Sequence, residues 1–264
     1  MYRAHWGLRE SPFRSSPCAR YFYESPVHDE ALSRLHYLIE NRRRVGLLVG
    51  PRGSGKTLLF DVFRQQMRKQ GAEVAEVCAI GARERDLLWS LAESLRLSPR
   101  DDAETFSLWR MLSDCIVELR YQQRPVALLV DDADRAGDDV RRLCLRLAQI
   151  DPSPSAMVTL ILSVADERRL GRSLLELCDL RIDLDPWEAD DTAGYLNACV
   201  AHAGRAEPIF DLAATQRIHM LAQGIPRRVS QLAELALLAG AGKRLESVDE
   251  ETVESAYREL FAGA

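Results

Sequence analysis

A glycine-rich turn lies between an apolar run and a lysine that is followed by a threonine. The turn and its flanks read GLLVGPRGSGKTLLF at residues 46–60. Gly50–Thr57 fits the spacing G-x-x-x-x-G-K-[ST], in which a strand ends in a loop and a helix follows. Glycines let the backbone N–H groups of such a loop turn toward an anion, and the next helix adds its unpaired donors and positive dipole end. The motif predicts a site for the phosphates of a nucleotide.

The positions of this loop have separate expected roles. Lys56 is predicted to reach the β- and γ-phosphate oxygens, and the hydroxyl of Thr57 to hold Mg²⁺. The alternative, a glycine-rich turn that happens to precede a helix, fits poorly because the whole spacing and both flanks match. The other loop residues expected around the nucleotide are Gly50, Pro51, Arg52, Gly53, Ser54, Gly55 and Leu58.

Two acids follow a later apolar run, in ALLVDD at 127–132. Mg²⁺ is usually held by one or two carboxylates together with substrate phosphates, and the acid lies at the carboxyl end of a buried strand. We expect Asp131 to serve the magnesium side, acting through bound water. We expect Asp132 to act as a general base or to orient the attacking water.

An acidic turn that caps the next helix is the alternative for this segment. That alternative suits Asp134, Asp138 and Asp139. It does not suit Asp131, because this residue follows a fully apolar strand.

Short apolar runs alternate with helical patterns up to residue 186. The predicted strands are 45–49, 73–80, 125–132, 156–164 and 180–184. The predicted helices are 56–70, 84–95, 103–122, 138–149 and 167–177. Continuous apolar runs separated by helices are typical of a parallel sheet covered on both faces. We therefore expect an α/β fold with a three-layer αβα core.

The pattern changes at LDPW, residues 184–187, because proline disfavours helix in the residue before it. Only helical periodicity follows, over 189–203, 209–223, 227–239 and 249–261. We predict two domains. They are residues 1–186, the N-terminal segment with the core, and residues 187–264, a small all-helical lid.

The composition excludes several classes of protein. With 47% hydrophobic and 28% charged residues, the chain is typical of a globular rather than a disordered protein. Its longest apolar stretch is too short to cross a bilayer, and the N-terminus lacks the apolar stretch of a secretory signal. The six cysteines are dispersed without a CxxC motif, which predicts free thiols and a cytoplasmic protein. The net charge of −5 argues against non-specific binding of nucleic acid.

Four segments frame nearly the whole chain: HWGLRESPF at 5–13, YFYESPVHDEALSRLHYLIE at 21–40, GLLVGPRGSGKT at 46–57 and GIPRRVSQLAELALLAG at 224–240. Together they resemble the AAA+ ATPases, and more narrowly the general secretion pathway protein A (ExeA) type. The resemblance implies a P-loop NTPase that binds and hydrolyses ATP with Mg²⁺. It also implies homo-oligomers on ATP binding and a lid whose angle follows the nucleotide state. No N-K-x-D motif for guanine is present, which favours ATP.

The resemblance gives roles to three polar residues. Arg227 looks like the second sensor of the lid and would reach the γ-phosphate, with Arg228 as its rival. The alternative is that both arginines only decorate the start of a helix. Ser163 is similar to the first sensor, between the two acids and the γ-phosphate. Its alternative is a buried serine that caps the next loop.

The N-terminal segment of such ATPases helps to enclose adenine. The candidates here are Phe13, Tyr21 and Tyr23, with Ile225 closing from the lid. Aromatic rings suit a purine, and they suit a hydrophobic core equally well. We expect His28 to be structural.

Three features bear on turnover. Most relatives carry glutamate at the second acid, and Asp132 is shorter by about one C–C bond, so slow hydrolysis is expected. No polar switch residue ends the segment 73–80, where relatives often place asparagine. An arginine finger acting on a neighbouring subunit would come from Arg168, Arg169 or Arg172.

Three functional classes follow from the resemblance. The leading one is an ATP-driven motor or switch in a secretion-related assembly, whose protein partner the sequence does not identify. The second is a DNA-associated ATPase of transposition or origin-binding type, and the third a nucleotide-binding scaffold with little turnover. ExeA-type members commonly continue into a transmembrane helix and a peptidoglycan-binding domain, whereas this chain is expected to stop after the lid.

Overall fold

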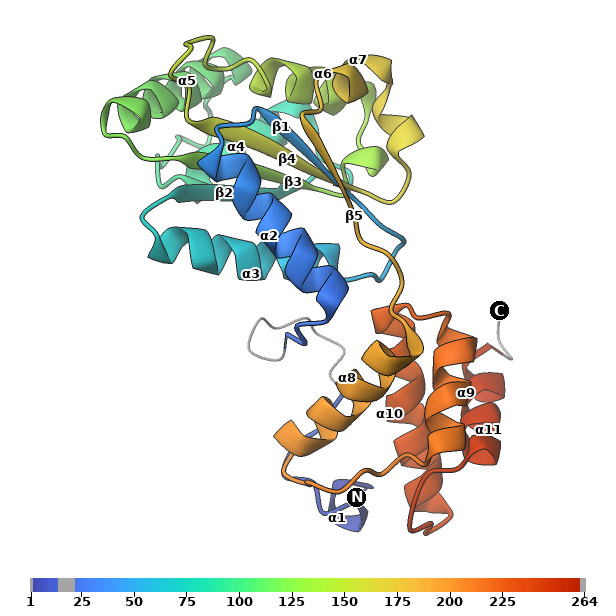
Figure 1. Ribbon diagram of the computed structural model, residues 1–264. Helices are drawn as coiled ribbons and strands as arrows, with labels where there is room; N and C mark the ends of the chain where they lie inside the picture. Colours follow the sequence, from blue (N-terminus) through green and yellow to red (C-terminus); the bar gives the residue numbers. More distant parts are fainter. Residues whose placement is uncertain (1, 14–21, 262–264) are drawn as a thin grey trace. The chain divides into compact units, whose positions relative to one another are not determined.

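The computed structural model describes residues 2–13 and 22–261. These residues form two compact units, both drawn in Figure 1. The α/β unit comprises His28–Pro51 and Lys56–Leu184. The helical unit comprises Met1–Val27, Arg52–Gly55 and Asp185–Ala264.

The α/β unit is built on one sheet of five parallel strands, in the order β2-β3-β4-β1-β5. Every residue of β3 and β4 is buried, as expected for the central strands of a sheet with helices on both sides (Figure 1). Because the strands are parallel and β3, β4 and β1 are neighbours, the carboxyl ends of these three strands lie next to one another at the same end of the sheet. The strands are β1 (Val45–Val49), β2 (Glu73–Cys78), β3 (Val126–Asp131), β4 (Val158–Val164) and β5 (Leu180–Asp183).

The helices of this unit connect the strands at nearly the predicted positions. The prediction of one continuous helix over 167–177 is wrong. Gly171 has a φ of 85° and divides this segment into η3 and α7. The elements are α2 (Pro26–Glu40), α3 (Lys56–Lys69), α4 (Glu84–Ser94), α5 (Thr105–Tyr121), η2 (Ala133–Arg135), α6 (Asp138–Leu147), η3 (Glu167–Leu170) and α7 (Arg172–Glu176).

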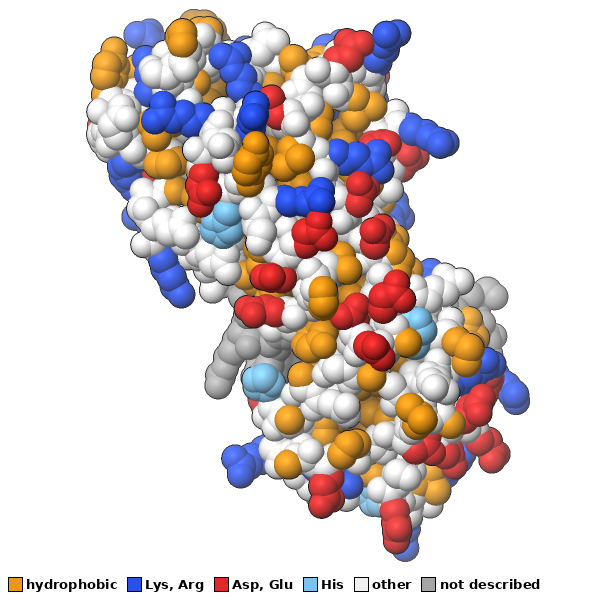
Figure 2. Space-filling model, viewed as in Figure 1, with side chains coloured by type: hydrophobic (Ala, Val, Ile, Leu, Met, Phe, Trp, Pro, Cys, Tyr) orange, Lys and Arg blue, Asp and Glu red, His pale blue; other side chains and the backbone are white. Residues whose placement is uncertain are grey.

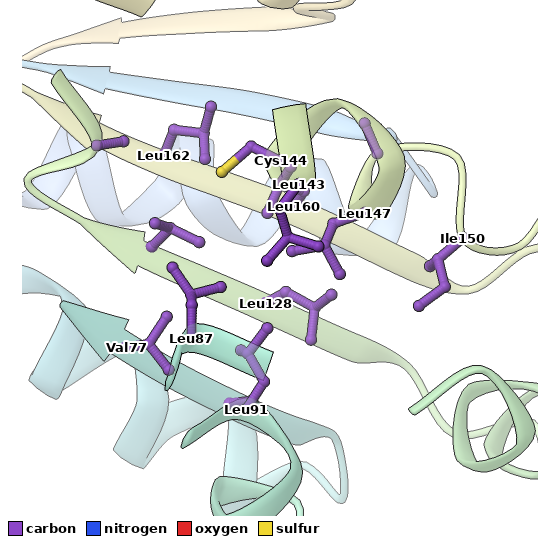
Figure 3. Packing of buried hydrophobic residues seen from close by; sticks show 14 of the residues in the cluster. Val77, Leu87, Leu91, Leu128, Leu143, Cys144, Leu147, Ile150, Leu160 and Leu162 are labelled. Carbon is purple, nitrogen blue, oxygen red and sulfur yellow. The ribbon is translucent and has the colours of Figure 1, made fainter. Parts of the chain in front are cut away.

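One hydrophobic cluster joins the sheet to the helices of the α/β unit. Leu128 of β3 and Leu160 of β4 are each 1% exposed. These two residues are paired in the register of adjacent parallel strands, and paired side chains face the same side of a sheet, so they present a continuous apolar surface to α4 and α6. Figure 3 shows the residues that cover it, among them Leu87, Leu91, Leu143, Cys144 and Leu147. This packing fixes the ends of the strands, where the candidate site lies.

The helical unit has its own core, to which the N-terminal segment contributes. The indole of Trp6 is 1% exposed and donates a hydrogen bond to the carbonyl oxygen of Leu237 at 2.9 Å. The hydroxyl of Tyr2 donates to Glu234 at 2.6 Å. The helices are α1 (Tyr2–His5), α8 (Ala189–His202), α9 (Leu212–Ala222), α10 (Pro226–Gly242) and α11 (Glu250–Phe261).

The packing of the first residues differs from the grouping expected from sequence. Of the first 27 residues, those that the structure describes, 2–13 and 22–27, lie with the C-terminal helices rather than with the α/β unit, because Trp6 and Phe13 are buried in the helical core. The helical unit also contains one isolated parallel bridge, between Phe210 and Val248. The division into domains 1–186 and 187–264 stays a prediction. Over the described ranges, no helix combines the length and apolar character needed to cross a bilayer.

The turn before α10 depends on a glycine, which gives a test of the fold. Gly224 has a φ of +66°, and a Cβ there would lie 2.2 Å from the carbonyl oxygen of Trp187. We expect Gly224→Ala to lower the free energy of unfolding by about 2 kcal/mol or more, measured by urea denaturation followed by circular dichroism. Gly242→Ala is the control: its Cβ meets nothing within 4 Å, and we expect a gain of about 0.5 kcal/mol. Equal stabilities for the two variants would contradict this prediction.

Candidate functional site

The predicted phosphate loop follows β1 and leads directly into α3. Lys56, the first residue of α3, is 6% exposed, and its Nζ donates hydrogen bonds to the carbonyl oxygens of Gly50 at 2.7 Å and Pro51 at 3.0 Å. Gly53 and Gly55 have φ values of 89° and 101°, which L side chains rarely adopt. The backbone is therefore curled where an anion-binding loop requires it.

The remaining loop residues differ in exposure. Arg52 and Thr57 are exposed, Ser54 is buried, and Leu58 is half-buried. Ser54 thus lies in the packed interior, whereas Thr57 lies at the surface of the α/β unit.

Thr57 and Asp131 meet although they are 74 residues apart in the sequence. The hydroxyl of Thr57 donates to Oδ2 of Asp131 at 2.6 Å. The hydroxyl of Ser163, at the end of β4, donates to Oδ1 of the same carboxylate. Ser163 Oγ also accepts the backbone N–H of Asp132 at 3.0 Å. One fully buried serine therefore holds both predicted acids.

The conformation of Asp132 sets it apart from the strand it follows. Its φ of 52° and ψ of 41° are left-handed, a region that non-glycine residues occupy uncommonly. Burial raises the pKa of its carboxyl above the ordinary value, and the negative charge of Asp131 adds to this, while Lys56 opposes it. A carboxylate with a raised pKa is a stronger proton acceptor, which suits a general base.

The donor atoms at Thr57 and Asp131 fit Mg²⁺. This ion prefers oxygen ligands, and it usually keeps several waters while bound by one or two carboxylates and substrate phosphates. Within residues 2–13 and 22–261, no group of three His, Cys, Asp or Glu side chains could hold a metal by itself. A hydroxyl and one carboxylate beside an anion-binding loop match a metal whose other ligands come from phosphate and water.

Within the helical unit, the start of α10 contacts the loop backbone. The N–H of Arg227 donates to the carbonyl oxygen of Gly53 at 3.1 Å. A Cβ on Gly53 would lie 2.9 Å from Cβ of Arg227 and 3.2 Å from Cγ2 of Ile225. The exposed side chain of Arg228 instead donates to Gln223 at 3.1 Å. Of the two rival arginines, Arg227 is the one in contact with the loop.

The aromatic candidates for adenine binding lie in the helical core. The ring centroid of Phe13 is 6.0 Å from that of Phe210, and the centroid of Tyr23 is 5.7 Å from that of Trp187. Both positions match the hydrophobic-core alternative. Tyr21 lies outside the described residues.

Other predicted residues are distributed over the α/β unit. His28 is buried, 3% exposed, near the start of α2, in keeping with a structural role. Asp134 does not cap the next helix, since the residue at the N-cap of α6 is Gly137. The carboxylate of Asp134 instead accepts the backbone N–H of Asp166 at 3.3 Å. No local sequence pattern indicates this partner, because Asp166 lies in the loop after a different strand.

A cavity of about 270 Å³ beside Thr57 and Asp131 was not foreseen. Glu76 on β2 has a carboxylate oxygen 3.2 Å from Nε of Arg64 on α3. Burial raises the pKa of Glu76 to about 7, although Arg64 opposes the rise. The sequence shows an acid in an apolar strand, but its partner depends on how α3 packs on the sheet. The other residues lining the cavity are Asp61, Val77 and Cys78.

Comparison with known proteins agrees with this geometry. Residues 39–169 match the family described as AAA domain. The chain carries an AAA domain. The AAA+ resemblance and the expected three-layer fold are thereby confirmed.

Three relatives describe the likeness further. The chain is 29% identical over 245 residues to general secretion pathway protein A of Aeromonas hydrophila, covering 90% of this chain and 45% of that relative. It therefore spans less than half the length of its curated relative. Cdc6p of Pyrobaculum aerophilum has a TM-score of 0.76 at 20% identity, over 95% of this chain and 70% of that one. The ORC1 protein of Aeropyrum pernix in complex with DNA has a TM-score of 0.69 at 18% identity, over 91% and 67%. At these identities the two structures show the fold alone.

The raised pKa of Glu76 predicts a pH-dependent stability. The carboxyl keeps its proton to about pH 7 in the folded chain, against an ordinary pKa of 4.5, so ionisation destabilises the fold progressively over that interval. Glu76→Gln does not ionise and escapes this loss. We expect the unfolding free energy of the variant, minus that of the parent, to rise by about 1–3 kcal/mol from pH 5 to pH 8 in urea denaturation. A difference independent of pH would show that Glu76 titrates normally.

Proposed function

We propose that this protein is a Mg²⁺-dependent ATP hydrolase, with its nucleotide bound by the loop Gly50–Thr57. The observation that carries the proposal is the 2.6 Å hydrogen bond from Thr57 to Asp131, which joins the end of the phosphate loop to the acid of a separate strand. The AAA domain over residues 39–169 supports ATP as the nucleotide.

The residues of the loop and of the strand ends have separate roles in ATP hydrolysis. Lys56 and the loop amides bind the phosphates. Thr57 and, through water, Asp131 would hold Mg²⁺, which supplies positive charge to the phosphate oxygens. Asp132 accepts a proton from the water whose oxygen attacks the γ-phosphorus. The bond from that phosphorus to the bridging oxygen breaks and leaves ADP and phosphate, while Ser163 keeps the two acids in register.

The lid residues connect this chemistry to movement. We propose that Arg227 binds the γ-phosphate with its side chain and that Ile225 borders the nucleotide. Because the N–H of Arg227 is bonded to Gly53, a change in the loop is passed directly to the start of α10. ATP binding would in this way change the lid and favour a homo-oligomer.

A secretion-related assembly is the proposed setting, and it rests on the Aeromonas hydrophila relative. The five cysteines in the described part of the chain are free thiols, which supports a cytoplasmic location. The DNA-associated alternative would be favoured by salt-sensitive DNA binding, which the net charge of −5 disfavours.

Substitutions in the loop test the proposed activity. We expect Lys56→Ala to weaken ATP binding by about tenfold or more, because charge-assisted hydrogen bonds to phosphate are lost. Lys69→Ala, at the exposed end of the same helix, is the control and should bind normally. Asp132→Glu should raise turnover by lengthening the base. Calorimetry with ATP and Mg²⁺ and a phosphate-release assay measure these effects, and normal binding by Lys56→Ala would refute the proposal. Binding without any phosphate release, in the parent and in Asp132→Glu alike, would favour the scaffold.

The two arginines of the lid give a matched pair. We expect Arg227→Ala to retain ATP binding and to lose about tenfold or more in turnover, because a charge that meets the transferring phosphoryl group is removed. Arg228→Ala, whose side chain bonds to Gln223, should keep most of its turnover. The ratio of the two turnover numbers is the measurement, and the reverse ratio would assign the sensor to Arg228.

A further inference from the structure

Asp134 joins two turns at the carboxyl edge of the sheet. The turn η2 contains Asp134 and directly follows Asp132, while η3 follows β4. Asp134 is 3% exposed, and its Oδ2 accepts the backbone N–H of Asp166, the N-cap residue of η3, at 3.3 Å. The acid turn and the turn after β4 are thus linked by one buried carboxylate.

The energetics of Asp134 do not suit a residue kept for stability. Its Oδ1 is buried and has no hydrogen-bond partner among the residues that the structure describes. Burying a carboxylate costs free energy that one hydrogen bond to a neutral N–H offsets poorly. Asparagine could accept the same N–H with a smaller desolvation cost. An unsatisfied buried group in a native structure calls for another explanation.

Both ends of this link lead to groups that matter for function. On one side, the N–H of Asp132 is held by Ser163, whose hydroxyl is bonded to Asp131. On the other side, Asp166 accepts the N–H of Arg168 at 3.1 Å. The link therefore runs from the candidate metal site to the start of η3.

The turn η3 carries exposed positive charge. Arg168 and Arg169 are both exposed, and neither forms an ion pair within residues 2–13 and 22–261. Arg172, the third arginine of this region, is paired with Glu176 at 2.7 Å. The position of η3 thus decides where two unpaired guanidinium groups are presented.

We propose that Asp134 is a positioning residue that passes the state of the nucleotide site to the turn bearing Arg168 and Arg169. The inference rests on the proposed function, because it needs a ligand at Thr57 and Asp131. The Thr57 hydroxyl can keep donating to Asp131 while its lone pair meets a cation. The nearby positive charge makes the Asp131 carboxylate a weaker acceptor, so the hydrogen bond that it accepts from Ser163 changes when the site fills. Ser163 carries that change to Asp132, and Asp134, two residues later, carries it to Asp166.

Substitutions at Asp134 separate this role from a purely structural one. Asp134→Ala removes the acceptor, Asp134→Asn keeps one, and Asp138→Asn alters an exposed acid of the same region as control. Hydrogen–deuterium exchange of residues 165–171 is measured with and without ATPγS and Mg²⁺, and binding is measured by calorimetry. We expect ATPγS to change the exchange in the parent, in Asp134→Asn and in Asp138→Asn, but not in Asp134→Ala. Asp134→Ala should also lose about threefold to thirtyfold in kcat at unchanged KM, with Asp134→Asn largely restored.

The outcomes separate the inference from the proposed function. Two results overturn the inference when the parent binds ATPγS. One is that ATPγS changes the exchange of residues 165–171 in Asp134→Ala as it does in the parent. The other is that Asp134→Ala and Asp134→Asn show the same exchange. If the parent binds no nucleotide, the proposed function fails, and nucleotide coupling through Asp134 fails with it. The exchange of nucleotide-free protein still tests the hydrogen bond itself: Ala, but not Asn, should speed exchange of the Asp166 amide about fivefold. If the Asp134→Ala variant does not fold, the Asp134→Leu variant takes its place. The leucine side chain fills the volume of the aspartate and offers no hydrogen-bond acceptor.

Discussion

The hydrogen bonds of the Asp131 carboxylate are the interaction on which the candidate site depends. Thr57 reaches one oxygen from the start of α3, and Ser163 reaches the other from the end of β4. Three elements from separate parts of the chain therefore converge on one side chain. Their convergence follows from the strand order, since β3 lies beside β4 and β4 lies beside β1.

Two acids with raised pKa values and one buried ammonium group surround this carboxylate. Asp132 and Glu76 both have raised pKa values because burial disfavours their charged forms, and the charge of Asp131 raises both further. Lys56 is buried as well, and its ammonium group donates to two carbonyl oxygens of the loop. Such an arrangement is poised for an anion with a divalent cation, because these ligands would compensate charges that the folded chain leaves close together.

The phosphate loop also has a part in the helical unit. Residues 52–55 pack there through Arg227 and Ile225, and Gly53 leaves no room for a side chain at this contact. The requirement for glycine is thus double: a left-handed φ and close packing against α10. Through this close packing, the start of α10 contacts backbone that would surround the phosphates.

The glycine-rich loop, the acids after β3 and the alternation of strands and helices could be predicted from the sequence, because each depends on local spacing and on apolar runs of characteristic length. The contact partners of individual side chains could not be predicted, because they depend on how the elements pack. Residues 2–13 pack with the C-terminal helices because Trp6 finds its hydrogen-bond acceptor on α10. Glu76 meets Arg64, and Asp134 meets Asp166 instead of capping α6. These contacts join residues from different elements, and their geometry is set by packing, which no local pattern encodes.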